Sequence, residues 1–273
     1  MKLKAPETVF SSAGFCPGCG HGLATRLIGE VSEELGIQEK MLAVVDVACC
    51  SFNIDYWRYD TIMAAHGRDI PTAVGVKHIR PENPVFAYLG DGAAYSIGMA
   101  ETIHAALRND NICVFVVNNS VFGMTGGQMA PTSLPNQVTQ PSPYGRDVST
   151  AGNHIRVSEL LNALDGPAYI ARVCVDTPMI VRNAKKAIKK AFQNQIDGVG
   201  YSFIEVVSTC PTTWGMTPQA AFEWMRVNML PYYPLGVVRD VTADGFANAA
   251  EAASARNAAC PIAHPEAVSE GGN

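Results

Sequence analysis

The chain alternates between two kinds of apolar segment, and this alternation constrains its fold more than any other feature. Segments such as 114–117 (Val-Phe-Val-Val) and 203–207 (Phe-Ile-Glu-Val-Val) are short runs of β-branched and aromatic residues. Such runs are typical of strands that are buried on both faces of a sheet. The segments between them carry apolar residues at helical spacing, so the sequence predicts βαβ units around a mostly parallel sheet.

These patterns give the expected elements and the fold class, which is α/β with a mostly parallel sheet flanked by helices. Strands are expected over residues 41–46, 85–89, 112–118, 168–175 and 201–208. Helices are expected over residues 20–36, 67–80, 95–108, 156–164, 178–195 and 217–229. We expect one domain over residues 1–236 and an Ala-rich C-terminal tail over residues 237–273 that is peripheral or contacts a partner.

Composition excludes several classes of function. The 273 residues are 48% hydrophobic and 16% charged, which is enough apolar material for a large core. A net charge of -5 without a long basic run argues against nucleic acid as a partner. No segment approaches the roughly 18 apolar residues of a membrane span, and the N-terminus has no apolar signal region. We therefore expect a cytoplasmic protein, whose eight cysteines indicate metal binding and core packing rather than disulfides.

Gly90-Asp91-Gly92 lies where a predicted strand ends and a helix begins. The two glycines allow the backbone to approach a phosphate, and the helix N-terminus favours its negative charge. Asp91 could then bind Mg²⁺, with the Asn119 amide oxygen and the Val121 carbonyl as further oxygen ligands. Taken alone, this motif is also typical of a tight turn with a capping aspartate.

A second motif follows at the end of the next predicted strand, where Asn118-Asn119 precedes the glycine-rich segment 123–128. The two motifs together resemble the thiamine-diphosphate-binding fold, whose Gly-Asp-Gly motif is followed some 30 residues later by Asn-Asn. The resemblance implies that Asp91, Asn119 and Val121 hold the metal ion. The long Gly-, Pro- and Thr-rich segment 120–153 is expected to be functional. The expected cofactor-binding residues are Gly90, Asp91, Gly92, Asn119, Val121, Gly123 and Thr125.

Cys16 and Cys19 are separated by two residues, so both sulfur atoms can turn toward one metal centre. A redox dithiol and a zinc site remain alternatives for this pair. Two further ligands are expected at strand ends, from Cys49-Cys50 and from Cys210. Two other cysteines, Cys113 and Cys174, lie within apolar strands, where buried thiols are common.

Four segments in fixed order sharpen the resemblance: Cys-Pro-Gly-Cys-Gly-His at 16–21, Cys-Ser at 50–51, Met-Thr-Gly-Gly-Gln-Met-Ala-Pro-Thr at 124–132 and Ser-Thr-Cys-Pro-Thr at 208–212. They resemble the beta subunit of 2-oxoacid:ferredoxin oxidoreductases, from about residue 15 to residue 236. The resemblance implies a [4Fe-4S] cluster bound by Cys16, Cys19, Cys50 and Cys210. The family places its ligand directly before Ser, which selects Cys50, and Cys49 is the alternative.

His66-Gly67-Arg68 lies between the cysteine pair and the Gly-Asp-Gly motif. The family resemblance places this segment beside the cofactor, so His66 or Arg68 could contact a diphosphate or the carboxylate of a substrate. We therefore name both as candidate catalytic residues. For Arg68 a surface salt bridge is an equally good interpretation.

The resemblance also implies an activity: the oxidative decarboxylation of a 2-oxo acid with coenzyme A to acyl-CoA and CO₂, with electrons passing through the cluster to ferredoxin. Segments 123–129 and 214–218 look more like the 2-oxoisovalerate type than like the 2-oxoglutarate type, which is the alternative. The expected partners are alpha, gamma and ferredoxin-like delta subunits. Because the family places the glutamate that contacts the aminopyrimidine in another domain, we expect the chain to be inactive alone.

Two rival functions remain open on the sequence. One is a non-catalytic, zinc-bound scaffold on a degenerate thiamine fold, although Asp91, Asn119 and their glycines are all present. The other is a non-oxidative thiamine-dependent decarboxylase with a structural metal. Iron content and dependence on coenzyme A would distinguish these functions.

Overall fold

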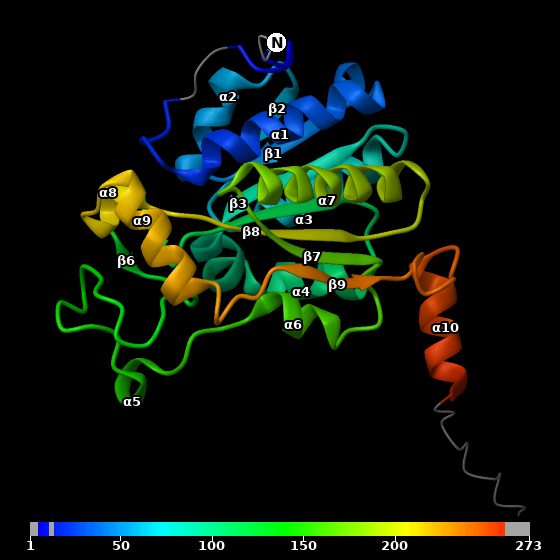
Figure 1. Ribbon diagram of the computed structural model, residues 1–273. Coiled ribbons are helices and arrows are strands. Elements are labelled where there is room, and N and C mark those ends of the chain that lie inside the picture. The colour runs from blue at the N-terminus through cyan, green and yellow to red at the C-terminus, as the bar shows by residue number, and fades with distance from the viewer. Residues whose placement is uncertain (1–4, 11–13, 260–273) are drawn as a thin grey trace, which may run out of the picture.

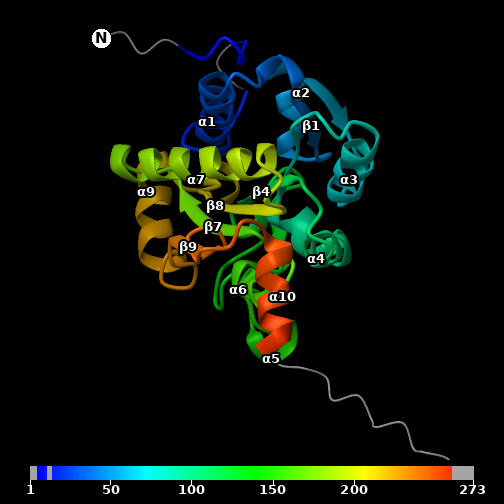
Figure 2. The same cartoon turned by 90° about the vertical axis from the view of Figure 1, so that its right-hand side faces the viewer.

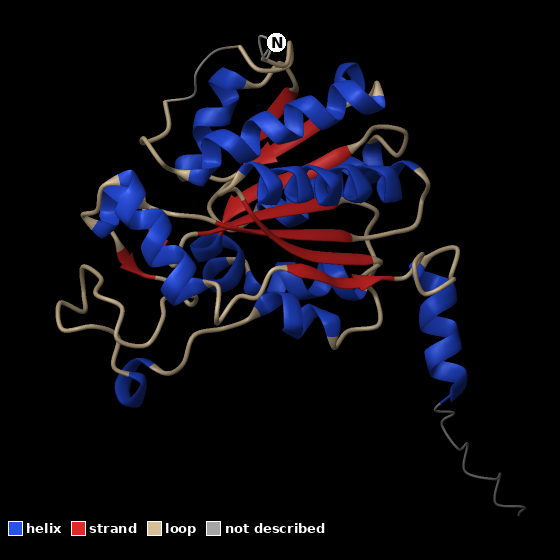
Figure 3. Cartoon of the chain, in the orientation of Figure 1, coloured by secondary structure: helices blue, strands red, loops and turns tan. Residues whose placement is uncertain are grey.

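A seven-stranded sheet forms the centre of the protein, which a computed structural model describes over residues 5–10 and 14–259. All strand pairs in the sheet are parallel except β7 and β9, which are antiparallel. The predicted α/β class with a mostly parallel sheet is confirmed (Figure 3). The strands in sheet order are β2 (Asp60–Met63), β1 (Leu42–Val45), β3 (Val85–Gly90), β4 (Cys113–Asn118), β8 (Ser202–Val207), β7 (Tyr169–Cys174) and β9 (Gly236–Asp240).

Helices cover both faces of this sheet (Figures 1 and 2). On one face lie α1 (Gly20–Leu35) and α7 (Pro178–Ile196), which pack against each other. The other face is covered by α3 (Asp69–Ile79), α4 (Met99–Leu107) and α6 (Val157–Asn162). The crossovers that contain α3, α4, α6 and α7 therefore place helices over the sheet, as is typical of parallel pairing.

Alternation of side chains along the central strands separates two cores. Phe86, Tyr88 and Phe115 pack in the core beneath α1 and α7, whereas Leu89 and Val116 pack in the core beneath α3 and α4. The register pairs Tyr88 with Phe115 and Leu89 with Val116, so each core receives matching rows from β3 and β4. Burial on both faces explains why these strands are continuous apolar runs in the sequence.

The five predicted strands are confirmed, each within one residue at either end. Two edge strands, β2 and β9, were not predicted.

The helix expected over 95–108 is a π-helical turn, η3 (Ala93–Ile97), followed by α4. The helix expected over 217–229 consists of α9 (Pro218–Trp224) and a π-helical turn that follows it, η4 (Met225–Met229). The remaining short elements are η1 (Gln38–Lys40), η2 (Cys49–Phe52), α2 (Asn53–Tyr56), α5 (Val148–Ala151), α8 (Pro211–Trp214) and the hairpin of β5 (Val121–Phe122) and β6 (Gln128–Met129).

The C-terminal part of the described chain returns to the sheet before it leaves it. β9 pairs with β7, although sequence analysis assigned residues 237–240 to the tail. The next helix, α10 (Ala249–Ala259), projects from the end of the sheet opposite α8 (Figure 1). Residues 260–273 of the predicted tail lie outside the described residues. Among residues 5–10 and 14–259, no helix is both long enough and apolar enough to cross a bilayer.

Candidate active site

Asp91 follows β3 at the carboxyl end of the sheet and is 1% exposed. Its Oδ1 accepts a hydrogen bond from the Gly92 amide at 2.9 Å, and its Oδ2 accepts one from the Ser120 amide at 2.9 Å. The Thr132 hydroxyl also donates to Oδ2. Burial raises the pKa of Asp91 to about 7 despite these donors. A cation at this position would offset the cost of the buried negative charge.

The two asparagines at the end of β4 have different partners. Asn118 Nδ2 donates to Glu205 at 2.8 Å, toward the interior of the sheet. Asn119 Oδ1 accepts from the Val121 amide at 3.3 Å. Ser120 joins Asn119 to the hairpin that begins at Val121. Its backbone is left-handed, with a φ of 61°, which reverses the direction of the chain. Asn119 rather than Asn118 therefore shares a pocket with Asp91, as the sequence predicted.

This pocket, with a volume of about 40 Å³, brings together residues from five segments of the chain. Gly90, Asn119, Val121 and Gly123 line it, as the sequence analysis expected for cofactor-binding residues. An added Cβ at Gly90 would meet open space, so the backbone there is accessible to a phosphate group. The other lining residues are His21, Asp46, Ala48, Cys49, Cys50, His66, Asp91, Gly92, Ala93, Phe122 and Met124.

Two glycines of the motifs allow close approach of other side chains. A Cβ at Gly92 would overlap the ring of Phe122. A Cβ at Gly123 would lie 3.1 Å from the Cys210 sulfur and 3.7 Å from the Asn119 amide nitrogen. The loop after β4 thus lies directly against Cys210. The cofactor motif and the cysteine motif, which are separate in the sequence, therefore lie next to each other in the structure.

Four thiols gather beside this pocket. Burial raises the pKa of Cys19 to about 12, and electrostatic repulsion from Cys210, Cys49 and Cys16 contributes to the rise. The pKa of Cys49 is raised in the same way to about 11, mainly by burial and then by Cys210 and Cys16. Cys16 is exposed and the other three are half-buried, so all four are accessible from the surface.

Cys50, the predicted fourth ligand, lies differently from this group. It is fully buried and packs in the core beneath α1. Cys49 and Cys50 are consecutive in the short turn η2, so their side chains leave the backbone in different directions. The thiol that faces Cys16 and Cys210 is that of Cys49, which sequence analysis gave as the alternative ligand, whereas Cys50 interacts electrostatically with Cys19 and Cys49. Cys113 and Cys174 are buried within β4 and β7, as expected.

Hydrogen bonds attach the segment of the N-terminal cysteines to the carboxyl end of β8. The Gly20 amide donates to Ser208 Oγ at 3.1 Å, and the Thr209 hydroxyl donates to the Gly18 carbonyl. These bonds connect the start of α1 to the loop after β8, which carries Cys210. Residues far apart in the sequence are thereby held at one edge of the sheet.

The donor sets fit the groups that the sequence predicted. Asp91, Asn119 and Val121 supply only oxygen ligands, as Mg²⁺ requires. Within residues 5–10 and 14–259, no three His, Cys, Asp or Glu side chains converge on a single metal ion. A cubane cluster binds each of four thiolates to a different iron atom, so its ligands do not need to converge on one point.

The other expected site residues divide into two groups. His66 lines the pocket, and its Nδ1 lies 2.6 Å from Asp46 Oδ1. Arg68 instead forms an ion pair with Glu101 at 2.7 Å and donates to the Ile97 carbonyl at 3.1 Å. Thr125 is exposed, and its hydroxyl donates to Gln128 at 2.5 Å. In this structure, Arg68 and Thr125 therefore bond to neighbouring protein groups away from the pocket lining.

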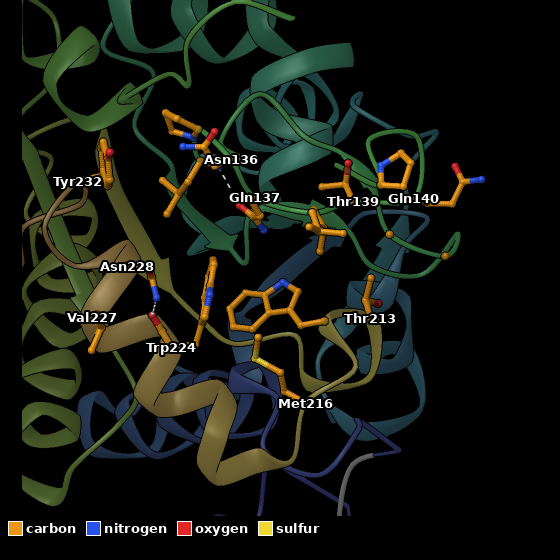
Figure 4. A pocket seen from close by; sticks show the side chains of 18 of the residues that line it. Asn136, Gln137, Thr139, Gln140, Thr213, Met216, Trp224, Val227, Asn228 and Tyr232 are labelled. Carbon is orange, nitrogen blue, oxygen red and sulfur yellow. Dashed lines mark hydrogen bonds between the residues drawn. The ribbon is translucent and has the colours of Figure 1, made fainter. Parts of the chain in front are cut away.

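A larger cavity of about 830 Å³ adjoins the pocket at Val121. Figure 4 shows Gln137, Thr139 and Gln140 on one side of this cavity and Met216 and Trp224 on the other. The described residues that line it include no acidic, basic or histidine side chain. The cavity is therefore suited to uncharged groups.

Three residues of the site were missed by sequence analysis. Thr132 donates to Asp91, and the buried carboxylate of Glu205 fixes Asn118. Arg146 is 5% exposed and donates to six backbone carbonyls, which holds the segment 130–153 together. Glu205 had a signal in the sequence, because it is a charged residue within an apolar strand. Thr132 and Arg146 had no comparable local signal.

Comparison with known proteins agrees with this geometry. Residues 46–206 match the family model of the thiamine pyrophosphate enzyme C-terminal TPP-binding domain. A solved structure of 2-oxoglutarate:ferredoxin oxidoreductase from Magnetococcus marinus is similar, with a TM-score of 0.68 and 23% identity. The similarity covers 88% of this chain and 86% of that chain. It therefore extends over most of the fold.

Curated relatives include subunits of ketoisovalerate oxidoreductase and of 2-oxoglutarate synthase. Ketoisovalerate oxidoreductase subunit VorA of Methanothermobacter thermautotrophicus is 42% identical over 230 residues, covering 84% of this chain and 48% of that protein. The 2-oxoglutarate synthase subunit KorB of Methanothermobacter marburgensis is 35% identical over 222 residues, covering 79% and 74%. KorB of Methanocaldococcus jannaschii is 36% identical, covering 74% and 70%. The chain thus spans about half the length of VorA.

Proposed function

Since the chain belongs to the thiamine-diphosphate-binding subunits of the 2-oxoacid:ferredoxin oxidoreductases, we propose that it forms the active-site subunit of a complex that oxidises a 2-oxo acid to acyl-CoA and CO₂. Asp91, Asn119 and the Val121 carbonyl would hold Mg²⁺ against the diphosphate. Gly90 would leave room for the phosphate oxygens. Bound thiamine diphosphate supplies an electron sink for loss of CO₂ from a 2-oxo acid.

One observation carries this proposal: the diphosphate motif and the thiols meet at the same edge of the sheet. The Cys210 sulfur and the Asn119 amide nitrogen both border Gly123, where an added Cβ would lie 3.1 Å from the first and 3.7 Å from the second. Cys16, Cys19, Cys49 and Cys210 would hold a [4Fe-4S] cluster there. Electrons released at the thiamine would then have a short path to an iron-sulfur acceptor and on to ferredoxin.

For the substrate we propose 2-oxoisovalerate, with 2-oxoglutarate as the second candidate. The chain is 42% identical to VorA proteins and 33–36% identical to KorB proteins of methanogens and Archaeoglobus. The uncharged lining of the adjoining cavity supports the same choice. A second carboxylate, as in 2-oxoglutarate, would find no cation among the described lining residues.

The complex would include alpha, gamma and ferredoxin-like delta subunits. VorA is about twice as long as the part that this chain matches, and both VorA and KorB are named as subunits. An alpha subunit would supply the glutamate that contacts the aminopyrimidine ring. We therefore expect no turnover from this chain alone and full activity only in the assembled complex.

The test is anaerobic purification of the complex, followed by iron, sulfide and thiamine analysis and a viologen-reduction assay. The substrates are 2-oxoisovalerate, 2-oxoglutarate and pyruvate, each with and without coenzyme A. About four irons in this chain and coenzyme A-dependent reduction with 2-oxoisovalerate are expected. Zinc without thiamine would indicate a scaffold, and aldehyde release without coenzyme A would indicate a non-oxidative decarboxylase.

Single cysteine variants test the ligand set. Cys49→Ala and Cys210→Ala should each abolish the visible absorbance of the cluster. Cys174→Ala is the matched control, because this thiol is buried in the core and should leave the absorbance unchanged. Cys50→Ala tests the alternative ligand and should likewise leave the absorbance unchanged. Loss of absorbance in Cys50→Ala but not in Cys49→Ala would restore the sequence-based assignment.

A further inference from the structure

A buried carboxylate fixes the histidine of the pocket. Asp46 directly follows β1, and its side chain has no exposed surface. Its Oδ1 lies 2.6 Å from His66 Nδ1, and the His66 side chain is 31% exposed where it lines the pocket. The arrangement is that of a carboxylate oriented behind an imidazole, with only the imidazole open to a ligand.

The backbone around His66 is fixed as firmly as its ring. Gly67 has a left-handed φ of 72°, and a Cβ there would lie 2.9 Å from the Gly98 amide nitrogen. The Arg68 side chain anchors the same turn to the start of α4 through Glu101. His66 therefore presents one ring orientation to the pocket. Its ring lies 6.2 Å from that of Phe122, which lines the same pocket.

A carboxylate can only accept hydrogen bonds, so the contact with Asp46 places the proton of a neutral imidazole on Nδ1. The other ring nitrogen, Nε2, then carries a lone pair. We propose that Asp46 is a positioning residue that holds His66 in this tautomer, so that Nε2 accepts a proton from a thiol substrate at the pocket of Asp91 and Asn119. This inference rests on the proposed function, which supplies the thiol as coenzyme A.

The proton transfer balances without any further reactant. The S–H bond of the thiol breaks, an Nε2–H bond forms, and the products are a thiolate and an imidazolium ion. The negative charge of Asp46 at 2.6 Å stabilises the imidazolium. The thiolate is the form that attacks an acyl carbon, so the step prepares coenzyme A for acyl transfer.

A second buried carboxyl group lies near Asp46, and of these two groups Asp46 is the one that carries the negative charge. Asp69 lies at the start of α3, is fully buried, and interacts electrostatically with Asp46. Neither oxygen of Asp69 has a hydrogen-bond partner, and neither does Asp46 Oδ2. Two adjacent buried carboxylates repel each other, so one keeps its proton. Burial raises the pKa of Asp46, and the hydrogen bond with His66 opposes this rise and favours the charge on Asp46.

The test uses variants of Asp46 and His66 in the reconstituted complex. Asp46→Ala should lower kcat for acyl-CoA formation about 10- to 100-fold while KM for the 2-oxo acid stays the same. Asp46→Asn keeps an oxygen acceptor for Nδ1–H without the charge, and should lie between wild type and Asp46→Ala. Asp60→Asn is the matched control, since this exposed carboxylate lies on the neighbouring strand β2.

A double-mutant cycle separates positioning from simple support of the fold. In a His66→Gln background, Asp46→Ala should have almost no further effect on kcat, because it acts through the imidazole. Equal fold-losses in both backgrounds would overturn the proposal. Coenzyme A-dependent activity of wild type with unchanged kcat in Asp46→Ala would overturn it as well, and would leave the proposed function intact.

A second readout is independent of cofactors and of activity. In the 273-residue chain labelled with ¹⁵N-histidine, the ring signals of His66 should report the Nδ1–H tautomer, which Asp46→Ala should shift toward the Nε2–H tautomer. His66→Gln identifies the signals. An unchanged tautomer in Asp46→Ala would overturn the pairing even if the complex oxidises 2-oxo acids. A wild-type complex without such oxidation would refute the proposed function instead.

Discussion

Replacement of Asp69 by asparagine should raise the free energy of unfolding at alkaline pH much more than at pH 5. The Asp69 carboxyl group is fully buried, and neither of its oxygens has a hydrogen-bond partner. Burial, assisted by the negative charge of Asp46, raises its pKa from 3.8 to about 8. Asparagine has nearly the same shape and cannot ionise, so it isolates the effect of the charge.

The direction of this pH dependence follows from proton binding by Asp69 in the folded and unfolded states. The folded state binds this proton more tightly than the unfolded state, so stability is lost as pH rises from 3.8 and the loss is complete above about 8. At roughly 1.4 kcal/mol for each tenfold difference in proton affinity, the total loss is on the order of 5 kcal/mol. The Asp69→Asn variant should escape this loss, most of which falls between pH 5 and pH 8.

The measurement is urea unfolding followed by circular dichroism at pH 5, 7 and 9. Wild type, Asp69→Asn and the exposed control Asp60→Asn are compared, and only Asp69→Asn should become more stable relative to wild type as pH rises. The same pH dependence in Asp69→Asn and wild type would refute the reasoning. A constant difference at all three values would assign the effect to packing instead of ionisation.

Three further predictions concern the supports of the site. Glu205→Gln should lower the free energy of unfolding by about 3 kcal/mol in urea titrations, because buried Arg172 loses one of its two ion pairs, 2.7 Å from Glu205. Gly92→Ala should weaken thiamine retention and cost about 1–3 kcal/mol, since its methyl group overlaps the Phe122 ring; Phe122→Leu in the same chain should restore part of the loss. Arg146→Ala should accelerate proteinase K cleavage within residues 130–153, mapped by mass spectrometry, and unchanged cleavage there would contradict the role of its hydrogen bonds to the loop carbonyls.

Local patterns predicted the centre of the sheet but not its edges. β3, β4, β7 and β8 are buried on both faces, and this burial appears directly in the sequence as apolar runs. β2 is only four residues long and mostly exposed, so its composition resembles that of a loop. β9 is likewise partly exposed and joins the sheet in the antiparallel sense. The pairing of an edge strand with the sheet depends on tertiary contacts, and the hydrophobic periodicity of the sequence does not indicate these contacts.

The same division holds for the site. Asp91 and Asn119 lie within short motifs at strand ends, where sequence and position together indicate their role. Thr132 reaches Asp91 only because the intervening hairpin folds back. The choice between Cys49 and Cys50 depends on the direction of side chains in a single turn, which neighbouring residues do not encode.

The attachment of Gly18 and Gly20 to the loop after β8 sets an order of events during synthesis. On the ribosome, the first cysteines emerge long before Ser208 and Cys210, and β8 lies between β4 and β7 in the finished sheet. The nascent chain can thus form much of the diphosphate motif before Cys210 joins the three earlier thiols, Cys16, Cys19 and Cys49. A cluster held by Cys210 together with Cys16 and Cys19 would therefore be inserted only after β8, the last parallel strand, has joined the sheet.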